Sequence, residues 1–192
     1  MSDQPANPLF EHPAFAPAAK EIGRGALGQR LSAYVSGRAK RRDADPLLDP
    51  GASLLDFLLT VLGGEVESVM ATSERVQGKT TDAWFITLRF ADGLIATLDL
   101  GNFLPGSYPV DLELRLEFCG TDHVIVVEPA NVAVTVIGPD GLRRDEAYPE
   151  QYHERLSRYA EALQSGHVTS PASKVIEAVR RSAAAGEVTV VW

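Results

Sequence analysis

The segment from Asp111 to Phe118 alternates strictly between charged and apolar residues. One side of the extended chain would carry Asp111, Glu113, Arg115 and Glu117, and the other Leu112, Leu114, Leu116 and Phe118. Because side chains along a β-strand point alternately to two faces, the segment predicts a strand with one buried face and one face in solvent. Strands of this kind favour an antiparallel sheet that is covered on one side only.

The two-residue period recurs over much of the chain after residue 65. Asp92-Gly93 signals a hairpin between two such segments, and Pro139-Asp140-Gly141 signals a further turn. The strands that we predict in addition to Asp111–Phe118 are Gln29–Ser36, a segment around Val66–Ala71, Ala83–Phe90, Leu94–Asp99, His123–Glu128, Val132–Ile137 and Val188–Trp192.

Helical periodicity dominates in other segments. Asp49 and Pro50 are typical of a helix start, with aspartate as the N-cap and proline in the first helical position, and Gly63-Gly64 is a usual helix end. The charged run Arg38–Pro46 before this helix is expected to be a loop. The predicted helices are Ala14–Ile22, a helix from Asp49-Pro50 to Leu62, a helix carrying Tyr152, Leu156, Tyr159 and Leu163, and a helix that starts at Ser170-Pro171.

Strands and helices are segregated along the chain, which favours the α+β class over a doubly wound nucleotide-binding sheet. We predict a largely antiparallel open sheet of about six strands with helices packed on one face. Residues 1–13 are expected to be an extended lead-in, and residues 14–192 a single domain. With 192 residues and 45% hydrophobic composition, the chain can bury a core without disulfides or a structural metal.

Charge and composition exclude several classes of partner. The formal net charge of −8 gives no general attraction to nucleic acid or to anionic lipid, and the short basic run at Arg38–Arg42 is interpreted as part of a solvated loop. We identify no signal peptide and no membrane-spanning segment. The single cysteine, Cys119, fits the cytoplasm, and the four scattered histidines show no metal-ligand spacing.

Residues Gly23–Gly28 match the pattern Gly-x-Gly-x-x-Gly. The dinucleotide-binding version of this pattern follows a strand and opens a helix. Here a predicted helix comes first and a predicted strand follows. The glycines are therefore interpreted as a helix end and a turn, and no cofactor site is assigned to them.

Asp49, Ser53 and Asp56 form the local cluster that is best suited to ligand binding or catalysis. Their spacing would place all three on one helical face. Two carboxylates and a hydroxyl in a row suit the binding of a polyol, or acid–base chemistry. The alternative is structural: an N-cap, a serine in the capping turn and a polar interruption of an amphipathic helix.

Several segments together resemble the C-terminal half of the glucose-fructose oxidoreductase/inositol dehydrogenase (Gfo/Idh/MocA) family. The resemblance spans residues 10–192. In that family the helix corresponding to Asp49–Gly63 begins with Asp-x-Gly-x-His-x-x-Asp, whereas this chain has Asp49-Pro-Gly51-Ala-Ser53-Leu-Leu-Asp56. The matching segments are, in order, His12–Phe15, Lys20–Gly28, Leu55–Gly63, Thr81–Gly93 and Leu116–Asp122.

The resemblance implies a nucleotide-binding domain before this one, with a catalytic lysine in a Glu-Lys-Pro motif, and a catalytic histidine at position 53. Ser53 holds the histidine position, and a hydroxyl does not titrate near neutral pH. None of the lysines (Lys20, Lys40, Lys79 and Lys174) lies in such a motif. We therefore expect no catalysis by this chain alone and no bound NAD(P) unless a partner supplies the site.

Three functions are open at this point. The first is a non-catalytic domain that forms a homo-oligomer through the open sheet face, as the family does, or binds a small sugar-like or polyol ligand with Asp49, Ser53 and Asp56. The second is the substrate-binding subunit of a split NAD(P)-dependent oxidoreductase, completed by a Rossmann-type partner. The third is an enzyme of another class that uses Asp49 and Asp56 as an acid–base pair.

Overall fold

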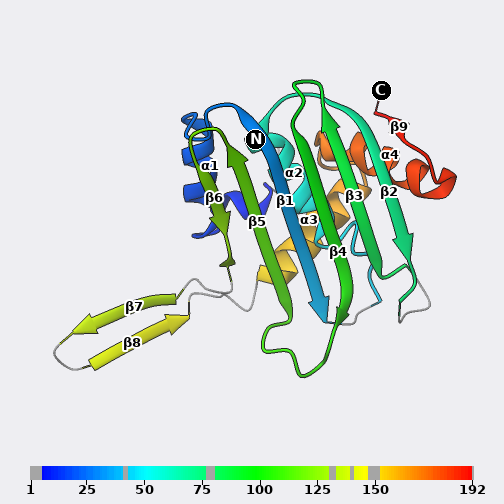
Figure 1. Ribbon diagram of the computed structural model, residues 1–192. Helices are drawn as coiled ribbons and strands as arrows, with labels where there is room; N and C mark the ends of the chain where they lie inside the picture. The colour runs from blue at the N-terminus through cyan, green and yellow to red at the C-terminus, as the bar shows by residue number, and fades with distance from the viewer. Residues whose placement is uncertain are drawn as a thin grey trace.

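A seven-stranded sheet forms the centre of the molecule in the computed structural model, which describes residues 6–40, 43–76, 81–129, 133–138, 141–146 and 152–191. The strands lie side by side in the order β6-β5-β1-β4-β3-β2-β9, and Figure 1 shows them edge to edge. Their bounds are β1 (Arg30–Lys40), β2 (Val66–Glu74), β3 (Ala83–Phe90), β4 (Ile95–Leu104), β5 (Leu112–Gly120), β6 (Val124–Val127) and β9 (Thr189–Val190).

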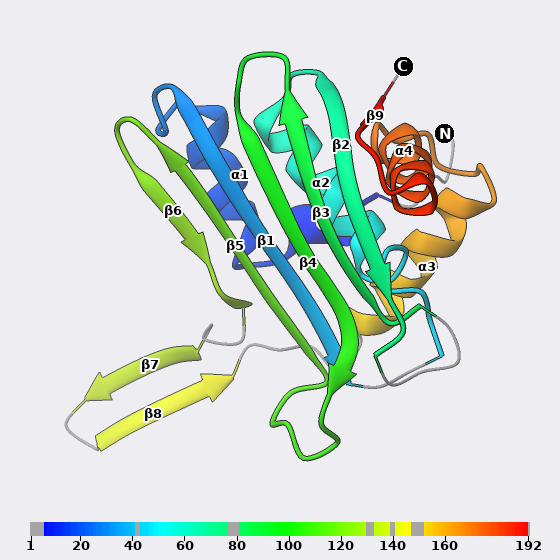
Figure 2. The same ribbon diagram turned by 45° about the vertical axis from the view of Figure 1, so that its right-hand side comes forward.

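All the helices cover the same face of this sheet, as Figure 2 shows. The buried apolar residues that alternate along the strands point toward these helices. The opposite face, called the open face below, carries none of the helices that the described residues form. This confirms the α+β class and the sheet with one covered face. The helices are the 3-10 turn η1 (Pro8–Glu11), α1 (Phe15–Gly23), α2 (Gly51–Leu62), α3 (Tyr152–Gln164) and α4 (Ala172–Ala185).

Strand β1 lies in the interior of the sheet, third from the β6 edge, between β5 and β4. It runs parallel to β4, whereas the other neighbouring strands of the sheet are antiparallel. The expected loop after residue 36 is wrong up to Lys40, because the strand continues through Arg38 to Lys40. Arg38 and Lys40 both have carboxylate partners. Arg38 pairs with Asp99 of β4, and Lys40 lies 2.7 Å from Asp111, which directly precedes β5. Local paired charges thus extend a strand that hydropathy alone would end.

Helix α2 lies in the core, and nearly all of its side chains are buried. The predicted end at Gly63 is confirmed, with a positive φ of 62° that suits glycine. The predicted start is wrong in detail: Pro50 occupies the N-cap position after a cis peptide bond, the helix begins at Gly51, and no side chain caps it. Asp49 therefore lies outside the helix and is available for other contacts.

Residues Gly23–Gly28 form the predicted helix end and turn. Helix α1 precedes them and β1 follows, the reverse of the dinucleotide-binding order. Gly28 has a φ of +68°, and a Cβ atom there would lie 2.5 Å from the Thr121 hydroxyl. The glycine thus allows the turn to pack closely against the end of β5.

Two segments differ from the expectations. The lead-in is not simply extended, because η1 forms within it and Leu9 is fully buried. A separate hairpin of β7 (Ala133–Gly138) and β8 (Gly141–Glu146) projects from the body beyond β6, as Figures 1 and 2 show. Strand β8 was not expected, since its charged sequence lacks an apolar period. Residues 139 and 140 of the predicted turn lie outside the described residues.

No helix in the described part of the chain is long and apolar enough to cross a membrane.

Candidate functional site

Asp49, Ser53 and Asp56 do not share one environment. Ser53 is fully buried, and among the described residues its Oγ atom has no hydrogen-bond partner. Asp56 is also buried, whereas Asp49 is half-buried and precedes the helix. The structure thus separates Asp49 from the other two, so their joint action on one ligand stays a prediction.

Asp56 is the centre of a buried polar cluster, called the Asp56 cluster below. Its Oδ2 atom accepts a hydrogen bond of 2.9 Å from Asn7 Nδ2, and its Oδ1 atom accepts one from the Ser170 hydroxyl. The Tyr159 hydroxyl also hydrogen-bonds to this carboxylate. Asn7 further donates to the Ser53 carbonyl at 2.9 Å. The carboxylate therefore joins the N-terminal segment, α2, α3 and the start of α4.

The pKa of the Tyr159 phenol is raised by its position in this cluster. Burial of the phenol raises its pKa, and the nearby charge of Asp56 and their hydrogen bond raise it further. The phenol is therefore neutral at all physiological pH values and serves as a donor. A neutral donor to a buried carboxylate fits a structural role for the pair.

Asp49 lies at a hollow of about 280 Å³ between the loop before α2 and helix α3. Its Oδ2 atom accepts a hydrogen bond of 2.7 Å from the Ser157 hydroxyl. We call this site the Asp49 hollow. Its lining residues are Ala44, Asp45, Leu48, Asp49, Ser157, Ala160, Glu161 and Gln164.

Asp45 holds the loop that presents Asp49. Its Oδ1 atom accepts from the Trp84 indole at 2.9 Å and from the backbone N–H of Leu47 at 3.0 Å, and its Oδ2 atom accepts from Arg180 at 3.3 Å. The Asp45 carbonyl accepts from the N–H of Asp49 at 2.9 Å. The wall of the hollow is thus positioned from both the sheet and α4.

The Asp49 hollow has the chemistry of a hydroxyl-rich ligand site. Carboxylate and amide groups of Asp49, Glu161 and Gln164 would accept and donate hydrogen bonds to a polyol. The sequence pattern indicated Asp49 but not Glu161 and Gln164, although these two residues lie three positions apart on one face of α3. Among the described residues, no group of three or more histidine, cysteine or acidic side chains could hold a metal ion.

The open face is the second candidate site, and it combines exposed apolar residues with charge. Phe85 is 50% exposed, Ile95 47% and Met70 38%. Residues from β1 to β4 surround a shallow groove of about 410 Å³ on this face. The groove residues that point outward are Tyr34, Met70, Thr72, Phe85, Thr87, Thr97 and Asp99.

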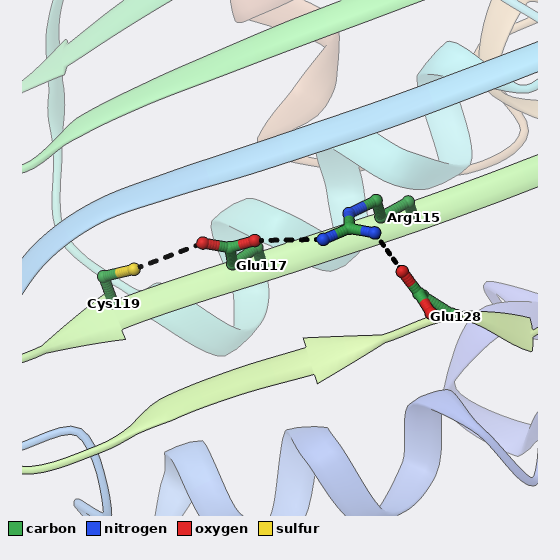
Figure 3. Close-up of polar contacts among 4 residues, drawn as sticks. All are labelled: Arg115, Glu117, Cys119 and Glu128. Carbon is green, nitrogen blue, oxygen red and sulfur yellow. Dashed lines mark hydrogen bonds and ion pairs between the residues drawn. The ribbon is translucent and has the colours of Figure 1, made fainter.

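A chain of polar contacts runs along β5 on the open face, shown in Figure 3. Arg115 pairs with Glu128 and lies 3.4 Å from Glu117, and the Cys119 thiol lies 3.6 Å from the same Glu117. These charges are only partly exposed, with 45% exposure for the Arg115 side chain. The predicted polar side of Asp111–Phe118 thus forms part of the open face.

Residues 19–126, more than half of the chain, match the model of the GFO/IDH/MocA C-terminal domain family. No curated protein matches the sequence.

Solved oxidoreductases share the fold at low sequence identity. Myo-inositol 2-dehydrogenase from Lactobacillus plantarum is 16% identical with a TM-score of 0.69, over 97% of this chain and 64% of that one. Scyllo-inositol dehydrogenase from Lactobacillus casei is 14% identical with a TM-score of 0.68, over 95% and 61%. An oxidoreductase from Agrobacterium radiobacter, solved with NAD+, L-tartaric acid and magnesium, is 20% identical with a TM-score of 0.63, over 99% and 63%. The chain therefore spans less than two thirds of the length of these relatives.

Proposed function

The chain belongs to the GFO/IDH/MocA C-terminal domain family, and from this premise we propose that it acts as an assembly domain that forms a homo-oligomer through its open face and does not transfer hydride by itself. The observation that carries the proposal is the exposed apolar group of Phe85, Ile95 and Met70 on a sheet face that no described element covers. Exposed apolar patches of this kind mark interaction surfaces. A second copy of the same face would bury it.

Phe85→Asp is expected to weaken self-association about a hundredfold, because a charge would be buried among apolar and threonine side chains. Sedimentation velocity over a concentration series measures the dissociation constant. Val76→Asp is the matched control, since Val76 is equally exposed but lies beyond the end of β2. A monomeric wild-type chain at micromolar concentration would contradict the proposal.

Ser53 supports the absence of hydride-transfer activity in the chain alone. Its hydroxyl is fully buried, so it has neither the acidity nor the access that a proton-transfer group needs. We expect no NAD(P) to bind to the chain alone. The cytoplasm is the expected compartment, since Cys119 is a free thiol.

A second candidate function is ligand binding, and the Asp49 hollow favours it. In this function the chain is the substrate side of an NAD(P)-dependent oxidoreductase, with a Rossmann-type partner that supplies the cofactor. Asp49 lies opposite polar residues of α3 in a hollow of about 280 Å³, which leaves room for a small polyol. Ser53 and Asp56 do not line it.

Calorimetric titration separates these candidates. We expect NAD(H) and NADP(H) to bind the chain alone no more tightly than about millimolar.

Myo-inositol serves as the polyol probe, and Glu161→Gln is expected to weaken its binding about tenfold, because a charge-assisted hydrogen bond is lost. Glu154→Gln on the same helix is the control, since Glu154 is exposed and does not line the hollow. Equal affinities for the two variants would contradict the assignment of the hollow.

A further inference from the structure

The N-terminal segment of residues 6–12, called the strap below, lies against three helices. Its 3-10 turn η1 packs on α1, α2 and α3. Leu9 is fully buried, and the ring centre of Phe10 lies 4.9 Å from that of Phe57 in α2. Asn7 donates two hydrogen bonds of 2.9 Å to groups of α2. The strap therefore covers one side of α2 through a small set of separate contacts.

His12 joins the strap to the start of α1. Its carbonyl accepts hydrogen bonds from the N–H of Phe15 at 3.0 Å and from the N–H of Ala16 at 2.9 Å. Its ring Nδ1 atom accepts a hydrogen bond of 3.1 Å from the N–H of Ala14. N–H groups at a helix N-terminus have no partner inside the helix. The imidazole thus serves as a cap for α1, in the way that an asparagine side chain usually does.

This arrangement requires a neutral imidazole. A ring nitrogen that accepts a hydrogen bond carries no proton, whereas both ring nitrogens of an imidazolium are donors. Protonation of Nδ1 would break the bond to Ala14 and place a positive charge at the positive end of the α1 dipole. Only 2% of the His12 surface is exposed, and its ring centre lies 5.3 Å from that of Phe15, so water would hydrate this charge poorly. Burial accordingly lowers the pKa of His12.

The described charged side chains of the strap and of the three helices are exposed, except for Asp56. The Asp56 carboxylate accepts hydrogen bonds from the other members of the Asp56 cluster. Glu11, the neighbour of His12 in the chain, forms an exposed pair with Arg155. Free carboxylic acids titrate about two units below free imidazole, so a test must separate His12 from these carboxylates. The exposed charged residues are Glu11, Lys20, Glu21, Glu154, Arg155, Arg158 and Glu161.

We propose that the strap is released in mild acid, because the imidazolium of His12 no longer accepts the Ala14 N–H and residues 6–12 then open away from α2. The released strap uncovers Phe57 and the Asp56 carboxylate. It binds one more proton than the closed strap, so the opening constant rises as the pH falls. The rise is up to about tenfold per pH unit below the ordinary imidazole pKa of about 6.5, until the lowered pKa of the closed state is reached. The strap packs on the helices and not on the open face, so its release is independent of assembly.

Amide hydrogen exchange at a series of pH values tests the release. The N–H groups of Leu9, Phe10, His12 and Ala14 are bonded within the strap or to the His12 ring, so their protection factors report its opening. We expect these factors to fall at least about threefold in the wild type between about pH 6.5 and about pH 5.5. His12→Asn is the matched variant, because asparagine keeps an acceptor for Ala14 but does not titrate. No such fall is expected in this variant.

His167→Asn is the control, since His167 is exposed and its replacement should keep the wild-type fall. An equal fall in His12→Asn would overturn the proposal and assign the effect to carboxylates. A parallel fall for the amides of α4 would also overturn it, because the whole domain would then open. Should His12→Asn fail to fold, an NMR titration of the His12 ring in the wild type decides. A measured pKa below about 6.5 supports the proposal, and a value at or above it contradicts the proposal.

Discussion

Asp56→Ala is expected to lower the free energy of unfolding by about 4 kcal/mol, because three buried donors lose one shared acceptor. Asn7 Nδ2, the Ser170 hydroxyl and the Tyr159 hydroxyl all donate to this carboxylate. All three donor residues are buried, with 3 to 8% of their surface exposed, so water would replace the lost acceptor poorly. The loss should therefore exceed that of an ordinary surface substitution several-fold.

Urea denaturation followed by circular dichroism measures this loss. Asp56→Asn is expected to lie between the wild type and Asp56→Ala, since an amide keeps one acceptor but faces the Asn7 amide with a second donor. Glu154→Ala is the control, because Glu154 forms only an exposed pair with Arg158 and should cost less than about 1 kcal/mol. Equal stabilities for Asp56→Ala and Glu154→Ala would show that the cluster has no structural role.

Phe57→Ala is expected to cost about 4 kcal/mol, the usual range for removing a fully buried phenylalanine. The Phe57 ring lies 4.9 Å from the ring centre of Phe10 and 5.3 Å from that of Phe15. Its removal would leave a cavity where η1 and α1 meet α2. Phe57→Leu fills most of this space and should cost about 1.5 kcal/mol or less.

The same denaturation experiment checks this second expectation. The slope of the unfolding free energy against urea concentration should stay near the wild-type value. An unchanged slope would mean that the variant exposes the same surface area on unfolding as the wild type. A loss below about 1 kcal/mol for Phe57→Ala would mean that the N-terminal segment does not pack on α2 as described.

The strands of the sheet could be predicted from sequence because each has one buried face. Ala83–Phe90 was predicted with the bounds observed for β3, since alternation continues through both ends. β1 and β4 extend farther than predicted, to Lys40 and Leu104, where paired charge or glycine interrupts the apolar pattern. Hydropathy detects burial, whereas the ends of strands depend on partners across the sheet.

The contacts of the site could not be predicted in the same way. Ser170 lies 114 residues from Asp56, and Asn7 lies 49 residues from it. The helical spacing of Asp49, Ser53 and Asp56 suggested one shared surface. The actual helix begins two residues after Asp49, and its packing buries both Ser53 and Asp56. The neighbours that pack on a largely apolar helix decide which of its sides meets solvent, and periodicity does not identify those neighbours.

The position of β1 bears on how the chain can be made. Among the described strands of the sheet, β1 is synthesised first although it lies in the interior, and both of its neighbours are synthesised later, β4 ending at Leu104 and β5 at Gly120. Until Gly120 has emerged from the ribosome, β1 lacks a neighbouring strand on one side or both. The nascent chain must therefore keep β1 without its full set of partners while the residues from Lys40 to Gly120 are synthesised, which favours slow folding and aggregation of early fragments.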